Sequence, residues 1–233
     1  MNRFSQSLRA KKAAGAIPVI PDFKRISPKC GELFAGRDPV ACARQLAGLG
    51  APAISVVTEE ENFGGSLSLL RCVAEAVDIP VLRKDFITCR ADLKQTCACG
   101  AAAVLLICAC MDRETLAALY QDALALGLEP LVEAHNEEEL ALCRALGAQL
   151  VGINNRDILA LERDAGTVAH TAALAAGKPG GALLISESGM ETPADVRRAV
   201  AAGADAALVG TALWRAPDLY AAYRELSGMG AQE

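Results

Sequence analysis

The chain has 233 residues, of which 52% are hydrophobic, 22% charged and only 4% aromatic. This length suits one large core, and the excess of small aliphatic residues over aromatic ones favours helices packed on aliphatic strands rather than an all-β sandwich. The net charge of −5, without a long basic run, argues against a nucleic-acid partner. Neither an apolar run of about 18 residues nor a signal peptide is apparent, so we expect no membrane span and a cytoplasmic protein.

One short pattern recurs along the chain and indicates the architecture. Helical sequence is followed by a glycine and then by a short aliphatic run, at Gly50, Gly100, Gly147 and Gly203. A glycine just past a helix adopts the left-handed conformation at low cost, so the chain can turn directly into a strand. The aliphatic runs do not alternate with polar residues, which is typical of parallel strands covered by helices on both faces.

The elements in chain order predict a barrel. Residues 1–16 are expected to form a short helical segment, with a helix at 4–14. Strands are expected at 17–23, 53–57, 80–84, 103–107, 129–134, 149–153, 182–186 and 206–210. Helices are clearest at 39–49, 67–77, 113–126, 137–146, 193–202 and 217–226. Eight βα units favour an α/β fold, a (β/α)8 TIM barrel occupying residues 1–233 as one domain. The alternative, an open doubly wound sheet, would need a Gly-x-Gly-x-x-Gly segment that is absent.

Polar residues stand where five of the expected strands end, which in such barrels is the side of the active site. They are Asp22 and Lys24, Lys84, Glu133, Asn154 and Arg156, and Glu187. A single charge in this position is commonly a structural ion pair, because burying an ion is costly unless it is paired. A cluster from five strands at one rim instead indicates function, and a desolvated lysine in such a cluster can serve as a general acid near neutral pH. We therefore expect Lys84 and Glu133 at the chemical centre.

The last two strand ends carry small residues with free backbone N–H groups, Ser188-Gly189 and Gly210-Thr211. Barrels of this kind bind a phosphate group with backbone amides, hydroxyls and a helix N-terminus after strands seven and eight. Ordinary turn glycines are the alternative. We expect a phosphorylated small molecule as the substrate.

Nine cysteines include two Cys-Ala-Cys pairs, Cys97/Cys99 and Cys108/Cys110. Close thiolate pairs can bind zinc, but cysteine also packs as a small apolar residue, and these pairs lie in Ala-rich sequence. We expect no metal site and no disulfide framework. The sequence leaves open whether Cys108 and Cys110 contact the substrate or only pack.

Six segments resemble the motifs of the indole-3-glycerol-phosphate synthase family, in the family's order and across residues 17–215. They are Asp22-Phe23-Lys24-Arg25-Ile26-Ser27-Pro28, Ser55-Val56-Val57-Thr58-Glu59, Leu82-Arg83-Lys84-Asp85-Phe86-Ile87, Leu131-Val132-Glu133, Gly152-Ile153-Asn154-Asn155-Arg156-Asp157 and Ser186-Glu187-Ser188-Gly189.

The resemblance implies a cyclising carboxy-lyase of tryptophan biosynthesis. Its substrate would be 1-(2-carboxyphenylamino)-1-deoxyribulose 5-phosphate, which loses carbon dioxide and water. The transiently cationic ring system serves as the electron sink, so no metal or organic cofactor is expected. We expect a monomer, or a protein associated with other enzymes of that pathway.

The resemblance also implies a role for each matching residue. Lys84 matches the general acid that protonates the ketone oxygen, Glu133 the base in dehydration, and Lys24 a contact of the substrate carboxylate that can act as the second acid. The remaining matches are residues that orient these groups (Asp22, Asn154, Arg156, Glu187), substrate contacts of the first strand's loop (Ser27), the apolar wall around the anthranilate ring (Phe63, Phe86, Leu105, Ile158) and phosphate contacts (Ser188, Gly189, Gly210, Thr211).

Two departures from the family leave alternatives open. The family normally has Glu where this chain has Asp22, and a carboxylate about 1 Å short can cost about 100-fold in rate. The segment before the first strand is also shorter than usual, so we expect only the last part of the family's N-terminal extension. The alternatives are a degenerate paralog that acts as a binding or scaffold protein, and another phosphosugar-binding barrel enzyme. An aminoaldose isomerase of the latter kind would typically place Asp or Cys, rather than Glu133, at the fifth strand end.

Overall fold

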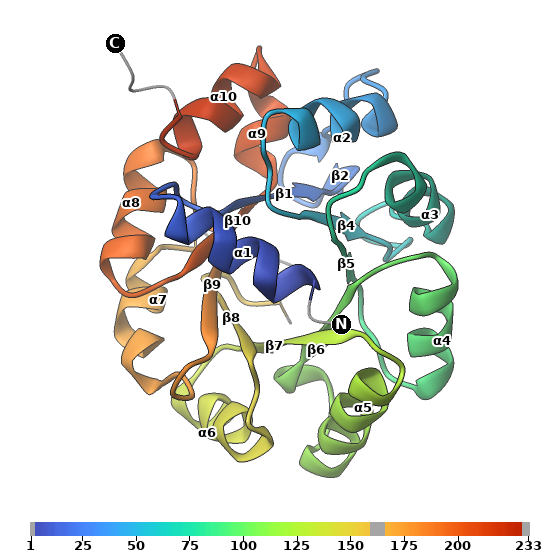
Figure 1. Cartoon of the computed structure of the whole chain (residues 1–233), viewed down its shortest axis with the longest axis vertical. Coiled ribbons are helices and arrows are strands. Elements are labelled where there is room, and N and C mark those ends of the chain that lie inside the picture. Colours follow the sequence, from blue (N-terminus) through green and yellow to red (C-terminus); the bar gives the residue numbers. More distant parts are fainter. Residues whose placement is uncertain (1–2, 159–165, 230–233) are drawn as a thin grey trace.

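The computed structural model describes residues 3–158 and 166–229. Eight parallel strands close into a barrel in the order β1-β10-β9-β8-β7-β6-β5-β4 (Figure 1). They are β1 (Val19–Phe23), β4 (Ile54–Val57), β5 (Val81–Lys84), β6 (Ala103–Ile107), β7 (Glu129–Ala134), β8 (Leu150–Asn154), β9 (Leu183–Glu187) and β10 (Ala206–Val209). The prediction of a (β/α)8 barrel is confirmed, and closure through the β1–β10 pairing rules out an open sheet.

Helices form an outer ring around the strands (Figure 1). They are α2 (Pro39–Gly48), α3 (Leu67–Ala76), α4 (Arg90–Ala98), α5 (Arg113–Ala125), α6 (Glu137–Leu146), α7 (Ala169–Leu174), α8 (Pro193–Ala201), α9 (Thr211–Arg215) and α10 (Leu219–Leu226). Side chains at their starts fix where several of them begin: Thr192, the expected cap of α8, accepts the backbone N–H of Asp195, as capping residues do. The six helices singled out from sequence are present, with ends shifted by at most two residues.

Shorter elements complete the chain. An antiparallel pair, β2 (Ile26–Ser27) and β3 (Gly31–Glu32), projects between β1 and α2. Single turns of 3₁₀ helix, η1 (Cys108–Cys110) and η2 (Ala175–Gly177), follow β6 and α7. Within the described part of the chain, no helix is both long and apolar enough to span a membrane.

Side chains alternate along each strand between two packed shells. One set fills the barrel and includes Ile20, Leu82 and Leu131. The other set packs against the surrounding helices, as Phe23 and Val132 do. Because successive strand residues point to opposite faces, parity along a strand decides whether a polar residue at its end faces the barrel mouth or a helix.

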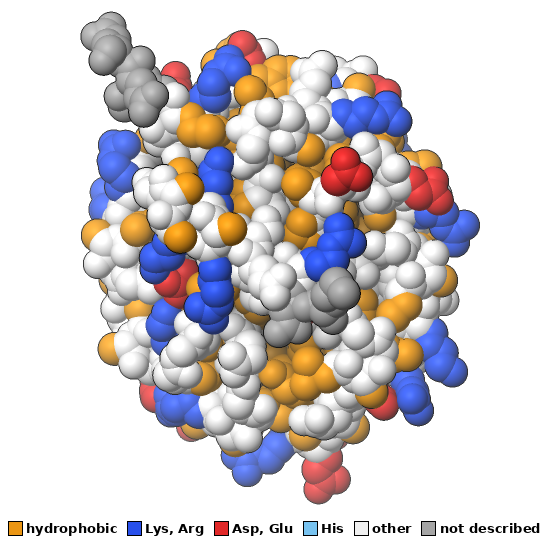
Figure 2. Space-filling model, viewed as in Figure 1, with side chains coloured by type: hydrophobic (Ala, Val, Ile, Leu, Met, Phe, Trp, Pro, Cys, Tyr) orange, Lys and Arg blue, Asp and Glu red, His pale blue; other side chains and the backbone are white. Residues whose placement is uncertain are grey.

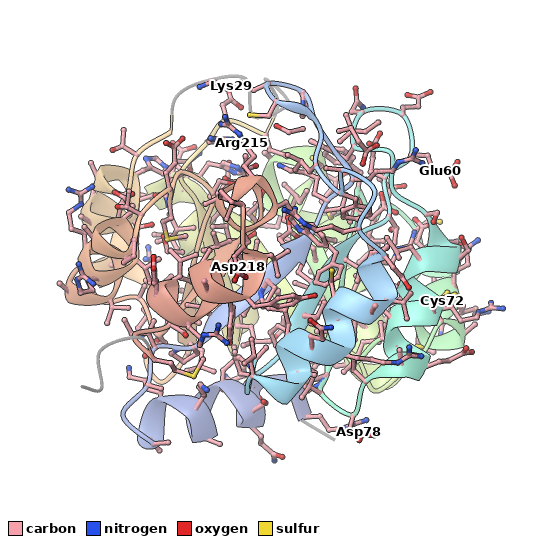
Figure 3. The ribbon with its side chains drawn as sticks, turned by 90° about the horizontal axis from the view of Figure 1, so that it is seen from above. Lys29, Glu60, Cys72, Asp78, Arg215 and Asp218 are labelled. Carbon is pink, nitrogen blue, oxygen red and sulfur yellow. The ribbon has the colours of Figure 1, made fainter. Side chains whose placement is uncertain are left out.

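The first helix, α1 (Arg3–Ala13), lies across the end of the barrel where the strands begin (Figure 1). Phe4 and Leu8 join the cluster inside the barrel, and the Glu129 carboxylate accepts the backbone N–H of Phe4 at 2.5 Å. In the view turned by 90° from Figure 1, α1 and Asp78 lie at one end of the barrel, and Lys29, Glu60 and Arg215 lie at the other (Figure 3). The helix preceding the first strand therefore plugs the bottom of the barrel and does not cover its mouth.

The bottom face carries basic side chains along α1 (Figure 2). Lys12 pairs with Asp205, and the Arg9 guanidinium donates to the carbonyl of Gly181 at 2.9 Å. The Lys11 ammonium donates to the carbonyl of Gly50 at 2.8 Å. Each of these partners precedes a strand, so α1 is fixed to the loops that enter the barrel.

Candidate active site

The carboxyl-terminal rim of the barrel gathers the polar residues expected there. The side chains that face the mouth are almost fully buried: Asp22 4%, Lys24 6%, Lys84 8%, Glu133 0%, Asn154 1%, Arg156 8% and Glu187 0% exposed. Strand register brings several of them together, since Asn154 pairs with Glu187 across β8 and β9. A buried charge is costly unless other groups or a ligand compensate it, so this concentration makes the rim the candidate site.

An apolar pocket opens at one side of the mouth. It is lined by Lys24, Val57, Glu59, Phe63, Lys84, Asp85, Phe86, Leu105, Ile107 and Ile158. All four residues expected to surround an aromatic ring are among them. The Lys24 ammonium lies 5.4 Å from the centre of the Phe63 ring, a distance at which a cation is attracted to the ring face. Two lysines thus border a pocket that suits a flat apolar group with a negative substituent.

The Glu59 carboxylate holds Phe63 in this wall. It accepts the backbone N–H groups of Asn62 and Phe63, both at 2.9 Å, and the Asn62 side-chain amide at 2.9 Å. The loop then needs a glycine at 65, because a Cβ there would overlap the Val57 carbonyl oxygen. The loop after β4 is therefore folded tightly enough to position an aromatic side chain.

A second, polar pocket lies between the ends of β9 and β10, and we call it the loop pocket. Its lining consists of Asp22, Lys24, Arg156, Ser188, Gly189, Met190, Glu191, Leu208, Val209, Gly210, Thr211 and Ala212. All four residues expected to bind phosphate are present, and Arg156 adds a cation. Lys24 lines both pockets, so a molecule with a ring at one end and an anion at the other could contact it in the middle.

Asn155 holds the loop after β9 in place. Its side-chain amide donates to the carbonyls of Glu187 and Ser188, both at 3.0 Å, and to the Ser186 hydroxyl at 3.0 Å. Its amide oxygen accepts the backbone N–H of Thr171 at 3.0 Å. Ser188 has a φ of +62°, a left-handed conformation that is costly for a residue other than glycine, and the Asn155 bonds help to offset that cost.

Asp22 is anchored from both sides. Its Oδ1 accepts the Ser55 hydroxyl at 2.7 Å, and its backbone carbonyl accepts the indole N–H of Trp214 at 2.8 Å. A Cβ at Gly210 would lie 3.2 Å from the Asp22 Cβ, so the absence of a side chain at 210 leaves Asp22 its space. The carboxylate is thereby held beside the loop pocket.

Two acidic side chains flank Gly152 on the inner face of the barrel. Glu133 pairs with Gly152 across β7 and β8, and a Cβ at 152 would overlap Oε1 of Glu187 and lie 3.2 Å from its Cδ. Among the described residues, neither carboxylate oxygen of Glu133 has a hydrogen-bond partner. Such an unsatisfied buried carboxylate is poised to accept a proton or a hydrogen bond from a bound molecule.

Other residues near the rim serve the framework. Arg83 points away from the mouth, because it is next to Lys84 on β5 and successive strand residues face opposite sides. Its guanidinium donates to the Thr58 hydroxyl at 2.9 Å and to the Asp85 carboxylate at 2.8 Å. Ser27, expected to contact the substrate, is buried in the β2–β3 hairpin, and its hydroxyl accepts the backbone N–H of Cys30 at 3.3 Å.

The cysteine pairs point to different neighbours. The Cys97 and Cys99 thiols face the carbonyls of Leu126 and Leu67, at 3.8 Å and 3.7 Å. Cys108 packs in the helix-facing core with Cys143, and Cys110 packs against the cluster inside the barrel. All nine cysteines are free thiols, and the described residues contain no group of three or more His, Cys, Asp or Glu side chains arranged to bind a metal ion.

His135 was not singled out from the sequence, although it follows Glu133 by two residues. Its Nε2 lies 3.3 Å from Oε1 of Glu133, and its Nδ1 lies 3.2 Å from Oε2 of Glu139. Burial lowers the pKa of His135, but the hydrogen bond to Glu139 and the negative charges of Glu133, Glu139 and Asp157 outweigh burial, so the pKa is raised. The even spacing of Glu133 and His135 along one strand was the available signal.

Fold and rim together define a (β/α)8-barrel enzyme with its polar groups at the ends of the strands. Residues 1–226 match the family model for indole-3-glycerol phosphate synthase. An indole-3-glycerol phosphate synthase of Pyrococcus furiosus is 43% identical over 208 residues, which cover 89% of this chain and 90% of that protein. Another from Thermococcus kodakarensis is 42% identical, over 90% of this chain and 92% of its own length. The chain belongs to the indole-3-glycerol phosphate synthase family and is a carboxy-lyase of this type.

A solved structure with the same fold illustrates how far sequence can diverge. Thiamine phosphate pyrophosphorylase from Pyrococcus furiosus superposes with a TM-score of 0.64 at 16% identity, covering 91% of this chain and 93% of that one. The likeness concerns the fold alone.

Proposed function

We propose that this chain converts 1-(2-carboxyphenylamino)-1-deoxyribulose 5-phosphate to indole-3-glycerol phosphate, with Lys84 as general acid and Glu133 as base. The observation that carries the proposal is the pair of pockets that share Lys24, one apolar and one lined by small residues with backbone N–H groups. The anthranilate ring would occupy the apolar pocket and the phosphate the loop pocket. The names of the relatives, indole-3-glycerol phosphate synthase, support the same assignment.

In the first step, Lys84 donates its proton to the ketone oxygen while the ring carbon that bears the carboxylate attacks the ketone carbon. Carbon dioxide then leaves, and its bonding electrons restore the aromatic ring. Lys84 lies in the wall of the apolar pocket, within reach of a group at the pocket's edge. A partly desolvated lysine is a suitable acid for this purpose.

In the second step, the new hydroxyl leaves as water after it receives a proton from Lys24, and Glu133 removes a proton from the neighbouring carbon. The Lys24 ammonium, lying at the junction of the two pockets, also contacts the substrate carboxylate before it is lost. Asp22, Asn154, Arg156 and Glu187 orient the substrate and the lysines. The complete burial of Glu133 keeps competing water away from its carboxylate.

The test is an assay of the purified chain with the anthranilate-derived ribulose phosphate, followed by indole fluorescence. Lys84→Met should lower kcat by about 100- to 10,000-fold, the usual contribution of a general acid. Lys29→Met is the matched control, because Lys29 is an exposed lysine at the same end of the barrel (Figure 3) and its loss should leave kcat unchanged. Absence of product with the wild-type chain would favour a degenerate paralog, and equal rates for both variants would refute the role of Lys84.

A further inference from the structure

The imidazole of His135 lies between two carboxylates. The residue follows β7 directly, and because it is two positions beyond Glu133, both side chains face the inside of the rim. Its Nε2 lies 3.3 Å from Oε1 of Glu133. On the other side, Oε2 of Glu139, on α6, lies 3.2 Å from Nδ1 and also accepts the His135 backbone N–H at 2.8 Å. The ring is thus fixed from a helix and turned toward the candidate base.

This geometry favours a protonated His135 beside Glu133. The Nδ1 atom must carry a hydrogen to bond to Glu139, so in a neutral ring Nε2 would present a lone pair to the Glu133 carboxylate. A lone pair at that distance from a carboxylate oxygen is repelled, whereas a protonated ring is attracted to it as an ion pair. Among the described residues, neither Nε2 nor either Glu133 oxygen has a hydrogen-bond partner, so their 3.3 Å contact is an ion-pair distance and not a formed hydrogen bond. We infer that the pair rests as an imidazolium next to a carboxylate.

The charges around the His135 ring are mostly negative, which favours a positive charge on the imidazole. Glu133 on β7, Glu139 on α6 and Asp157 after β8 act on the imidazole as negative charges, whereas Arg156 lines the same hollow as a cation. His170 on α7 contacts the His135 carbonyl oxygen through Nε2 at 2.7 Å. Cys110 and Cys108 lie near Glu133, and their pKa values are raised, for Cys110 chiefly by burial and for Cys108 chiefly by hydrogen bonding to Cys143, so both thiols remain neutral.

We propose that His135 is a positioning residue that keeps Glu133 ionised before it acts and passes to water the proton that Glu133 removes. This inference rests on the proposed role of Glu133 as a base. When Glu133 takes a proton from the substrate, its negative charge is neutralised and no longer stabilises the His135 imidazolium. The imidazolium then releases its Nε2 proton to water, which can reach it because 15% of the His135 side chain is exposed. Glu133 then transfers its proton from Oε1 to Nε2. One proton enters from the substrate, one leaves to water, and the resting pair is restored.

The first test needs no substrate. The chain has only two histidines, so NMR titration of the imidazole resonances is simple, and the signals that remain in His170→Gln are those of His135. The pKa of His135 should lie above the ordinary value of about 6.5. It should fall by about 1–3 units in Glu133→Gln and in Glu139→Gln, because each removes a neighbouring negative charge. An unchanged pKa in Glu133→Gln would overturn the ion pair between His135 and Glu133.

The second test uses turnover. His135→Gln should lower kcat about tenfold or more, as expected for loss of a close, partly buried charge partner of the base, with little change in KM because His135 does not line the pockets assigned to substrate. The limb of the kcat–pH profile that follows His135 should disappear in His135→Gln and move to lower pH in Glu139→Gln. His170→Gln is the matched control, since its amide can still donate to the His135 carbonyl.

The outcomes separate this inference from the proposed function. An inactive wild-type chain in which Glu133 still shifts the pKa of His135 would refute the function and retain the proton pair. An active wild-type chain whose His135→Gln variant keeps its kcat and its pH profile would refute the relay alone. If His135→Gln fails to fold, as judged by circular dichroism, Glu139→Gln decides: an unmoved pH profile with a lowered His135 pKa would overturn the relay.

Discussion

At the scale of single residues, Asp22 is one methylene group shorter than the Glu that the family normally has at this position. It lines the loop pocket, its Oδ1 accepts the Ser55 hydroxyl at 2.7 Å, and its side chain packs against Gly210, where an added Cβ would lie 3.3 Å from Oδ2. A longer side chain would carry the carboxylate further toward Lys24 and the bound substrate. We therefore expect Asp22→Glu to raise kcat or leave it unchanged in the indole fluorescence assay.

Asp22→Asn is the matched control for that change, because it keeps the size of the side chain and removes its charge. It should lower kcat, since in the proposed mechanism the carboxylate orients the lysine ammonium and the substrate. A large loss of activity in Asp22→Glu would instead mean that the site is adapted to the shorter side chain.

Gly152 gives a second prediction at this scale. A Cβ at this position would overlap the Glu187 carboxylate, so Gly152→Ala should displace Glu187, lower kcat and cost about 1–3 kcal/mol in the free energy of unfolding, as overpacking does. Gly48→Ala is the control, because no atom lies within 4 Å of a Cβ there. Urea unfolding and the activity assay measure both effects; a Gly152→Ala variant as active as Gly48→Ala would contradict this role for the glycine.

Which of these residues the sequence could predict depends on where their partners lie. Lys84 and Glu133 end apolar strands, and alternation along a strand turns both inward, so the sequence alone locates them. Glu129 has the same parity as Glu133, four residues earlier, yet it binds α1 at the other end of the barrel. Its role depends on a contact 125 residues away in sequence, and no local pattern indicates such a contact. The roles of Gly152 and Asn155 likewise depend on neighbouring strands.

At the scale of elements, α1 depends on one buried carboxylate. Glu129 is 7% exposed, and its oxygens accept the backbone N–H groups of Phe4 and Ser5, the latter at 3.1 Å. A negative charge at a helix N-terminus satisfies N–H groups that have no partner within the helix and interacts favourably with the helix dipole. Glu129→Gln keeps the shape and removes the charge, so we expect the free energy of unfolding to fall by about 1 kcal/mol.

Thermal or urea unfolding measures this loss, and Glu75→Gln, at an exposed position of α3, is the control. Activity should change little in Glu129→Gln, because α1 lies at the opposite end of the barrel from the candidate active site (Figure 3). A fall in kcat without a loss of stability would contradict a purely structural role for Glu129.

Elements differed in how well the sequence predicted them. Long amphipathic helices such as α5 and strands such as β6 carry enough periodic or aliphatic sequence to be found with nearly correct ends. The β2–β3 pair consists of two-residue strands, which are too short to show an alternating pattern of apolar and polar residues in the sequence. The six-residue α7 is too short for a periodic pattern, although the Thr167 hydroxyl accepts the backbone N–H of its first residue, Ala169, at 3.1 Å. Both short elements rely on contacts from elsewhere in the chain: the backbone N–H of Ile26 in β2 donates to the carbonyl of Phe63 at 2.9 Å, and the backbone N–H of Thr171 in α7 donates to the Asn155 side chain at 3.0 Å.

At the scale of the whole molecule, the two ends of the barrel have different tasks. The rim gathers buried charges around two pockets, an arrangement that suits ligand binding. The bottom is closed by α1 and satisfies its charges within the protein, as with Glu129 and Asp205. In barrels of this fold, residues at the carboxyl ends of strands serve function and those at the other end serve stability. The shared fold at 16% identity with thiamine phosphate pyrophosphorylase agrees with such a division, because a stable barrel does not determine what the rim binds.

Asp205 directly precedes β10 at the bottom of the barrel and pairs with Lys12 of α1. Its charge leads to a prediction about how the stability of the fold depends on pH. Its carboxylate also pairs with Lys178 at 2.6 Å, and it accepts the backbone N–H of Leu184 at 2.9 Å. Burial raises the pKa of this carboxyl, but these hydrogen bonds outweigh burial, so the pKa lies below its ordinary value. A carboxyl with a lowered pKa stabilises the fold above its unfolded-state pKa, and that contribution is lost as the pH falls through the folded-state pKa.

We therefore expect Asp205→Asn to lower the free energy of unfolding by about 2 kcal/mol at pH 7, and by progressively less as the pH falls below about 4. Urea unfolding at a series of pH values compares the variant with wild type. Asp78→Asn, at an exposed position on the same end of the molecule (Figure 3), should behave as wild type throughout. A difference between Asp205→Asn and wild type that stays constant down to pH 2 would mean that the side chain stabilises the barrel by its shape rather than by its charge.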